Sequence, residues 1–402
     1  MNSEMLSFEQ ALEVLLARAQ TLHETETLDL LEAHGRILGE PVIAPIDVPP
    51  HDNSAMDGYA LRCEDYVSGQ PLVVAQRITA GTVGAALQPG TAARIFTGAP
   101  VPGGCNAVMM QERCRAEGDR VWFEEAPHPG QNIRLRGEDI QAGSQILAAG
   151  KRLSAADQGL AASVGVACVK ALRRLKVAVF FTGDELTMPG EALRPGAIYN
   201  SNRFVLRSLL TGLGCEVTDL GTVRDTLEET VTALHAASTG HDVIITCGGV
   251  SVGEEDHVKA AVMAAGSLDV WKIAIKPGKP LAYGRVGEAD FIGLPGNPVS
   301  SFVTFLTLVR PFLLARMGSR NTVWKARAVQ AAFDWPKPDA RREFLRVRLD
   351  ANGRAVLYPN QGAGVLSSCA WAEGLVDNPP RQAIKAGDLV SYLSFAELES
   401  CA

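Results

Sequence analysis

Residues 176–186 read KVAVFFTGDEL, and residues 241–259 read HDVIITCGGVSVGEEDHVK. In both, a strand-length apolar run rich in β-branched and aromatic residues ends in a polar, glycine-containing turn. Segments with helical periodicity alternate with such runs, for example over 202–213, and a further strand is predicted at 291–294. Strands that alternate with helices are typical of a parallel sheet with helices on both faces. The sequence therefore predicts a central α/β domain.

The chain outside this region has a different rhythm. Ser7 and Gln10 form a capping-box pattern before an amphipathic helix, and 28–33 and 153–171 are also predicted to be helical, the latter packing on the first helix. Short β-type runs separated by Gly, Pro and Asn turns fill the stretch between Pro45 and about Ile140, and similar runs follow Asn321. The predicted domains are a discontinuous helical domain (1–44 plus 141–172), an inserted small β domain (45–140), the α/β domain (173–320) and a C-terminal β domain (321–402).

Composition excludes several classes of protein. The chain has 402 residues, 47% of them hydrophobic, and a formal net charge of −7, so it has no basic excess for nucleic acid or an anionic membrane surface. Its longest apolar stretches look strand-sized, which predicts no membrane span, and the polar N-terminus does not resemble a signal peptide. The eight cysteines include no CxxC pair, which predicts reduced packing thiols, with Cys247 the one in a glycine-rich turn. We expect a cytoplasmic protein.

Ligands of open α/β sheets bind at the carboxyl ends of the strands, so the turns that follow the predicted strands are the candidate site. Two turns have the glycine content and exposed helix-start amides that suit an anion: GGVSVG and PGNP. Asn297 is placed to cap the helix that Pro298 begins. Neither turn matches the phosphate loop of ATPases or the dinucleotide fingerprint. The candidate residues are Gly248, Gly249, Ser251, Gly253, Pro295, Gly296 and Asn297.

Charged side chains accompany these turns. Lys272 and Lys276 would share one face of a strand, and Lys279 follows in a loop stiffened by two prolines. Lysines act as point charges for oxyanions. Three lysines are as often simply part of a solvated surface. Several carboxylates near phosphates usually indicate a divalent cation such as Mg²⁺, although a single Asp in a loop more often caps a turn. The candidate acids are Asp57, Asp139, Glu185, Asp225 and Asp256.

Seven ordered motifs resemble those of the molybdopterin molybdenumtransferase family, which comprises the bacterial MoeA proteins and the gephyrin E-domain. The motifs are DNSAMDGYA (52–60), FTGAPVPGGCNAVMMQE (96–112), IRLRGEDI (133–140), TGDEL (182–186), GGVSVGEEDHVK (248–259), KIAIKPGKP (272–280) and GLPGNPVS (293–300). The resemblance implies a multidomain fold: a discontinuous N-terminal helical domain, an inserted β domain, a central MogA-like α/β domain that binds molybdopterin, and a C-terminal β barrel.

The resemblance also implies a reaction. Adenylylated molybdopterin and molybdate are the substrates, the pyrophosphate link is cleaved with release of AMP, and molybdenum is placed on the dithiolene sulfurs with the help of Mg²⁺. It further implies an elongated homodimer with a shared active site, to which Asp57 contributes across the interface, and a contact with the molybdopterin adenylyltransferase.

Family positions carry over one by one. The required acids fall on Asp57, Asp139, Glu185, Asp225 and Asp256, and the required lysines on Lys272 and Lys276. Glu185, Asp225 and Asp256 would hold Mg²⁺, while Asp57 and Asp139 would position the attacking water or the leaving oxygen. The resemblance adds Thr97, Lys279, Arg341 and Ser367 or Ser368 to the substrate-binding residues. Asn200 stands where relatives often carry Asp, which makes Asn202 the better ligand-facing candidate.

Two other functions fit the same sequence. A scaffold or carrier would bind molybdopterin without turning it over, although the retained acids argue against it. A Mg²⁺-dependent phosphotransferase acting on another nucleotide would hydrolyse ATP without any requirement for molybdate.

Overall fold

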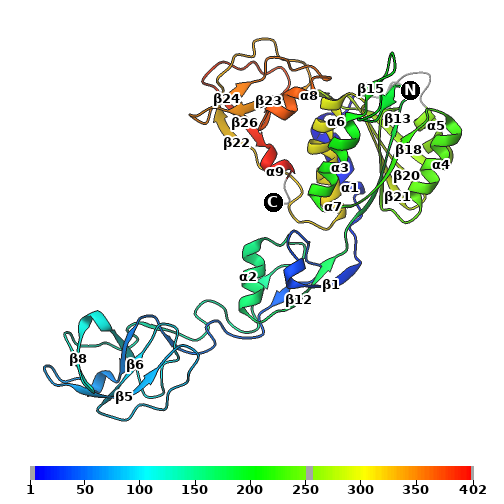
Figure 1. Cartoon of the computed structure of the whole chain (residues 1–402). Helices are drawn as coiled ribbons and strands as arrows, with labels where there is room; N and C mark the ends of the chain where they lie inside the picture. The colour runs from blue at the N-terminus through cyan, green and yellow to red at the C-terminus, as the bar shows by residue number, and fades with distance from the viewer. Residues whose placement is uncertain (1–4, 250–256, 400–402) are drawn as a thin grey trace.

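The computed structural model describes residues 5–249 and 257–399, which form an elongated molecule of several modules (Figure 1). The α/β module and the C-terminal module lie together at one end, a small middle module follows, and the inserted β module forms the other end. The predicted multidomain organisation of α/β and β parts is therefore confirmed.

The α/β module is built on a mixed sheet. Its strands, in spatial order, are β16 (Glu216–Val223), β13 (Lys176–Thr182), β17 (Val243–Cys247), β21 (Ala289–Leu294), β20 (Pro280–Val286) and β18 (Gly266–Lys272). The first four strands run parallel, as predicted. Strand β20 is antiparallel to β21, and β18 is antiparallel to β20, so β20 opposes the direction of the other strands of this sheet. These two strands were not predicted as such, because the glycines and prolines of 266–286 mask their strand pattern.

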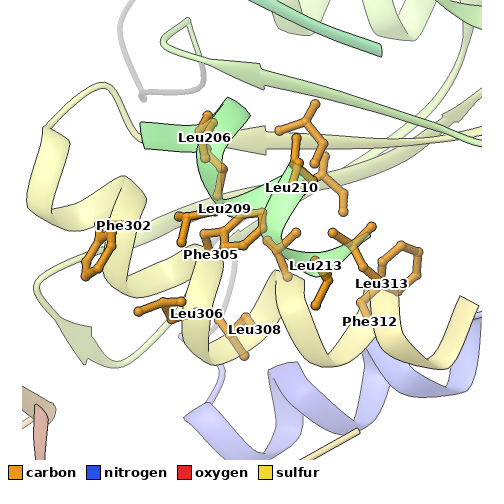
Figure 2. Close-up of a cluster of buried hydrophobic side chains, with 14 of the residues drawn as sticks. Leu206, Leu209, Leu210, Leu213, Phe302, Phe305, Leu306, Leu308, Phe312 and Leu313 are labelled. Carbon is orange, nitrogen blue, oxygen red and sulfur yellow. The ribbon is translucent and has the colours of Figure 1, made fainter. Parts of the chain in front are cut away.

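Helices cover both faces of this sheet. One face carries α4 (Leu227–Ser238) and α5 (His257–Ala265), and the other carries α3 (Ser201–Leu213) and the continuous helical stretch of α6 (Pro298–Thr304), the π-helical turn η4 (Phe305–Val309) and α7 (Arg310–Arg316). Successive strand residues point to opposite faces, so that Val177 and Val179 join the core under α3 while Ala178 and Phe180 join the core under α4. Leucines of α3 interdigitate with phenylalanines and leucines of α6 to α7 (Figure 2).

The helical stretch Pro298–Arg316 corrects one expectation. Its 19 residues and mean hydropathy of 1.5 meet the length and composition of a membrane span, whereas the sequence analysis recognised only strand-sized apolar stretches. The structure buries 89% of its most apolar window inside the protein, against α3 and the sheet. A helix that is apolar all round is expected at such a position in a core.

The N-terminal helix α1 (Phe8–Arg18) has the predicted capping box between Ser7 and Gln10. It does not pack on the 153–171 segment as expected, but against α7, with Phe8 and Leu15 in the core of the α/β module. Their apolar stripe finds its largest partner surface there. The first helix therefore packs the start of the chain against the α/β module.

The middle module joins two distant stretches of chain. β1 (Thr25–Asp29) pairs with β12 (Cys168–Leu172), β2 (Val42–Ile43) pairs with β11 (Gln145–Leu147), and α2 (Ala155–Ser163) covers them. The helical predictions for 28–33 and 153–171 are therefore wrong in part. Only the short turn η1 (Leu30–Glu32) and α2 are helical, because β pairing between the two stretches overrides local helix propensity.

The two β modules complete the fold. The sheet of the inserted module has the order β7 (Ala107–Met110), β4 (Gly58–Leu61), β6 (Thr91–Ile95), β5 (Leu72–Ile78), β9 (Arg120–Phe123) and β8 (Cys114–Glu117). Beside it, β3 (Asn53–Ser54) pairs with β10 (Ile133–Arg134).

The sheet of the C-terminal module has the order β19 (Ile275–Lys276), β23 (Arg342–Leu349), β25 (Gly374–Asn378), β26 (Leu389–Ser394) and β22 (Arg327–Gln330), with β24 (Ala355–Leu357) also on β23. A bridge between Ala331 and Ala355 links the end of β22 to β24, so the pairing runs around a circuit. The helices α8 (Leu366–Trp371) and α9 (Phe395–Glu399) flank it. Strand β19 belongs to the α/β segment of the chain, so the two modules are joined by a strand pair.

Candidate active site

A cleft of about 1040 Å³ opens at the carboxyl ends of β13, β17 and β21. Its other wall is formed by the C-terminal module, through Arg341 and the loop 361–364. The sequence-predicted residues that line it are Glu185, Asn202, Asp225, Gly248, Gly249, Lys276, Lys279, Pro295, Gly296, Asn297 and Arg341. The fold therefore brings most of the predicted turns and cations together, at the edge where open α/β sheets bind ligands.

Glycines are required where the loop after β17 leaves the sheet. Gly248 and Gly249 have φ values of 101° and 62°, which side-chain-bearing residues rarely adopt. A Cβ atom on Gly248 would lie 2.8 Å from the carbonyl oxygen of Thr182. The backbone of this loop therefore passes directly over the end of β13, where a side chain would clash. Ser251, Gly253 and Asp256, the remaining candidates of this loop, lie outside the described residues.

The second turn predicted to bind an anion, PGNP at 295–298, has the predicted backbone but lacks the predicted side-chain cap. Asn297 occupies the N-cap position of α6, with Pro298 in the first turn, yet its side chain makes no capping hydrogen bond. Asn297 is exposed and lines the cleft. Its amide group is thus available to a ligand instead of being used by the helix.

Asn202 connects the two turns. Its Nδ2 donates to the carbonyl oxygen of Gly296 at 2.7 Å and to Sγ of Cys247 at 3.1 Å, while its Oδ1 is buried without a hydrogen-bond partner among the described residues. Asn200 instead caps α3, by accepting from the amide of Arg203. Cys247 packs in the core of the α/β module as well as lining the cleft, and burial raises the pKa of its thiol to about 11.

The cations line the side of the cleft nearest the C-terminal module. The ammonium of Lys276 lies 3.2 Å from Glu343 and 3.4 Å from Asp339, and the guanidinium of Arg341 makes two hydrogen bonds to the Asp339 carboxylate. These bonds lower the pKa of Asp339 and raise that of Arg341. Lys279 is exposed and follows in the Pro-Gly loop.

Lys272 departs from the prediction. It ends β18, where it pairs with Pro280, and it does not line the cleft. Lys276 lies on a separate strand, β19, which pairs with β23 of the C-terminal module. The expectation that the two lysines share one face of a strand is therefore wrong, because the chain turns at Ile273 and Ala274 to leave one sheet and join another.

Two of the three predicted metal ligands line the cleft. Asp225 follows β16, and its Oδ1 is buried without a hydrogen-bond partner among the described residues, while Glu185 follows β13. An unpartnered buried carboxylate oxygen is costly unless a cation binds it, and carboxylate oxygens are hard ligands that suit Mg²⁺. Within residues 5–249 and 257–399 no group of three or more acidic, His or Cys side chains gathers; the third candidate, Asp256, lies outside this part of the chain.

Asp57, Thr97 and Asp139 lie outside the cleft. Asp57 and Thr97 belong to the inserted β module at the far end of the molecule (Figure 1), whereas Asp139 precedes Ile140, which packs with Val164 of the middle module. Asp57 precedes β4, and its Oδ1 accepts hydrogen bonds from the amide of Thr97 at 2.8 Å and from its hydroxyl at 2.7 Å. These bonds hold the pKa of Asp57 below its ordinary value, because both donors stabilise the ionised carboxylate. Asp139 is exposed, and its backbone amide donates to the carbonyl oxygen of Val48.

Replacing Thr97 by valine tests this contact. The variant keeps the amide donor and loses the hydroxyl donor, so the pKa of Asp57 is expected to rise part of the way toward its ordinary value. A carbon-detected NMR titration of the Asp57 carboxyl group measures the change. An unchanged pKa would show that the hydroxyl does not stabilise the carboxylate.

In the C-terminal module the structure also separates the two candidate serines. Ser367 is exposed on α8, and its hydroxyl lies 3.2 Å from that of Tyr358, whereas Ser368 is buried and accepts from Arg346. Neither lines the cleft, although Leu366 does.

Sequence reasoning missed Ser300 and the loop 361–364 as lining residues. The Gly-Ala-Gly of that loop was the only available signal.

Three family models match this chain: "MoeA N-terminal region (domain I and II)" over residues 6–165, "Probable molybdopterin binding domain" over 178–315, and "MoeA C-terminal region (domain IV)" over 328–395. The molybdopterin molybdenumtransferase of Haemophilus influenzae is 46% identical over 323 residues, which cover 80% of each chain. Molybdopterin molybdenumtransferase 2 of Mycobacterium tuberculosis is 38% identical and covers 88% of this chain and 90% of its own.

The solved structures agree with the sequence relatives. The molybdopterin biosynthesis MoeA protein of Pyrococcus horikoshii superimposes with a TM-score of 0.82 at 32% identity, over 98% of this chain and 99% of its own. The chain therefore belongs to the molybdopterin molybdenumtransferase family, which makes it an enzyme of molybdenum cofactor biosynthesis.

Proposed function

We propose that this enzyme inserts molybdenum from molybdate into adenylylated molybdopterin, with Mg²⁺ as cofactor and AMP as the second product. The observation that supports the proposal is the joint placement, in one cleft, of two amide-rich turns, three cations and an unpartnered buried carboxylate oxygen. Relatives named molybdopterin molybdenumtransferase support molybdopterin as the substrate. At about 1040 Å³, the cleft is at the upper end of usual ligand sites and suits a nucleotide-tagged pterin.

The described residues suggest a division of work within the cleft. The backbone amides at Gly249 and Gly296 would bind the phosphate and pterin polar groups, because backbone donors at strand ends suit oxyanions, whereas the amide of Gly248 already donates to the carbonyl oxygen of Leu294. Lys276, Lys279 and Arg341 would offset the charge of the phosphates and receive the molybdate dianion.

Glu185 and Asp225 would hold Mg²⁺, together with Asp256 of the adjoining loop. When bound, Mg²⁺ neutralises phosphate charge and stabilises a departing phosphate oxygen. Asp225 is the residue whose environment favours this role most directly, because its buried oxygen has no other described partner.

We further propose a homodimer in which Asp57 and Asp139 of one chain serve the cleft of the other. Within one chain, Asp57 lies in the inserted β module at the opposite end of the molecule from the cleft, and Asp139 lies beside Ile140, where that module meets the middle module. Their roles in positioning the attacking water or the leaving oxygen therefore require a second copy. We also propose a cytoplasmic location and a contact with the adenylyltransferase that supplies the substrate.

The test is a product assay with purified protein, adenylylated molybdopterin, molybdate and Mg²⁺. AMP and molybdenum cofactor are expected in equal amounts, with neither formed when molybdate is omitted. Ligand binding without AMP release would favour a non-catalytic carrier. Hydrolysis of ATP without molybdate would favour a phosphotransferase acting on another nucleotide.

A further inference from the structure

Behind the cleft, the C-terminal module holds a carboxylate that the site residues above do not include. Glu343 lies on β23 and is 1% exposed. Its Oε2 accepts hydrogen bonds from the indole Nε1 of Trp335 at 2.7 Å and from the amide of Asp339 at 3.1 Å. Its Oε1 accepts from the ammonium of Lys276 at 3.2 Å. One oxygen is therefore held by the C-terminal module itself, and the other is directed to a lysine that lines the cleft.

The backbone reinforces this contact. Lys276 and Glu343 are direct partners in the parallel pair of β19 and β23, so their side chains leave the sheet on the same face. The lysine side chain is 41% exposed, which lets its ammonium reach both Glu343 and the cleft. Lysine side chains have four rotatable bonds and lose much rotamer freedom when fixed. A buried, immobile acceptor is an efficient way to hold such a side chain in one place.

We propose that Glu343 is a positioning residue, whose buried carboxylate fixes the ammonium of Lys276 at the point where the anionic part of the substrate enters. The inference rests on the proposed function, because it assigns Lys276 to the oxyanion. Glu343 does not line the cleft, so it acts through Lys276. Asp339 holds Arg341 through two hydrogen bonds of 3.0 and 2.9 Å, which places the second cation beside the first.

The first experiment measures the position of Lys276 without any enzymatic turnover. The intact protein is treated with an amine-acylating reagent at one fixed pH, and labelling of Lys276 is measured by peptide mass spectrometry relative to exposed Lys170. In Glu343→Gln, the ammonium of Lys276 loses its charged, buried hydrogen-bond acceptor, so it is held less firmly and its relative labelling rate is expected to rise several-fold. Trp335→Phe, which removes one donor to Glu343, should give a smaller rise. Equal rates in wild type and both variants would overturn the proposal.

The second experiment uses AMP release and separates positioning from general structural damage. Glu343→Gln is expected to raise KM for molybdate by about tenfold, with a smaller change in kcat. In a Lys276→Met background the same change should have almost no further effect, because the residue through which it acts is gone. An equal loss in both backgrounds would overturn the proposal.

Asp350→Asn is the matched control. Asp350 pairs with Arg354 in the same module but away from the cleft, and its replacement should leave labelling and KM at wild-type values. If the wild-type protein releases no AMP at all, the proposed function fails, while the labelling rates still decide whether Glu343 positions Lys276.

Discussion

Asp225→Asn is expected to lower the rate of AMP release by about 100-fold or more, because it removes the carboxylate best placed to hold the proposed cation. The buried Oδ1 of Asp225 has no hydrogen-bond partner among the described residues, so this oxygen is not already used to stabilise the fold. The amide oxygen of asparagine is a weaker Mg²⁺ ligand without charge. The variant should therefore need more Mg²⁺ for the activity that remains, which a titration of initial rate against Mg²⁺ concentration measures.

Glu228→Gln is the control for this prediction. Glu228 is an exposed acid in the first turn of α4, close in sequence to Asp225 but absent from the cleft lining. It should leave both the rate and the Mg²⁺ dependence unchanged. If Asp225→Asn reduced the rate but required no more Mg²⁺ than wild type, Asp225 would not be a cation ligand.

Asp57→Ala is expected to fold normally and to lose most of the AMP release. The side chain is only half-buried, and its described hydrogen bonds are confined to Thr97, so its removal leaves the module cores intact. Thermal unfolding should be close to that of wild type, whereas activity should fall by about 100-fold if the carboxylate contacts the reacting groups.

Mixing variants tests whether the proposed site is shared between subunits. When Asp57→Ala and Asp225→Asn chains are unfolded, mixed and refolded, about half of the dimers should contain one of each chain and one intact site, which restores about a quarter of wild-type activity. The control mixture, Asp225→Asn with Lys276→Met, should gain no activity over its two separate components, because each cleft carries a defect. If the Asp57→Ala mixture also gained no activity, Asp57 would serve the cleft of its own chain or none.

The ends of the parallel strands show which parts of the site local sequence patterns can predict. The runs at 177–181, 243–246 and 291–294 were recognised as buried strands, and the polar turns after them do meet in one cleft. This succeeded because carboxyl ends of parallel strands share one edge by geometry alone. The prediction from local pattern was wrong for Lys272 and Lys276. Their spacing suits one strand, but the chain between them passes from one sheet to another.

Long-range pairing explains the other failures. Residues 168–172 have a helix-compatible, alanine-containing sequence, yet they form β12 because β1, more than a hundred residues earlier, supplies a partner strand. Glu343 and Asp339 carried no motif, and their contacts with Lys276 depend on a strand pair between two modules. No local pattern encodes such a contact.

The amino-acid sequence by itself determined the α/β alternation, the glycine turns, the family and the charged side chains that line the cleft, because these depend on periodicity and on short motifs. Tertiary structure alone decided which charged residues face one another. It placed Lys276 against Glu343, left Lys272 outside the cleft, and put Asp57 in the module at the opposite end of the molecule from Asp225. The physical reason is that periodicity fixes which way a side chain points within its own element, whereas electrostatic pairing depends on distances between elements that only the packed chain defines.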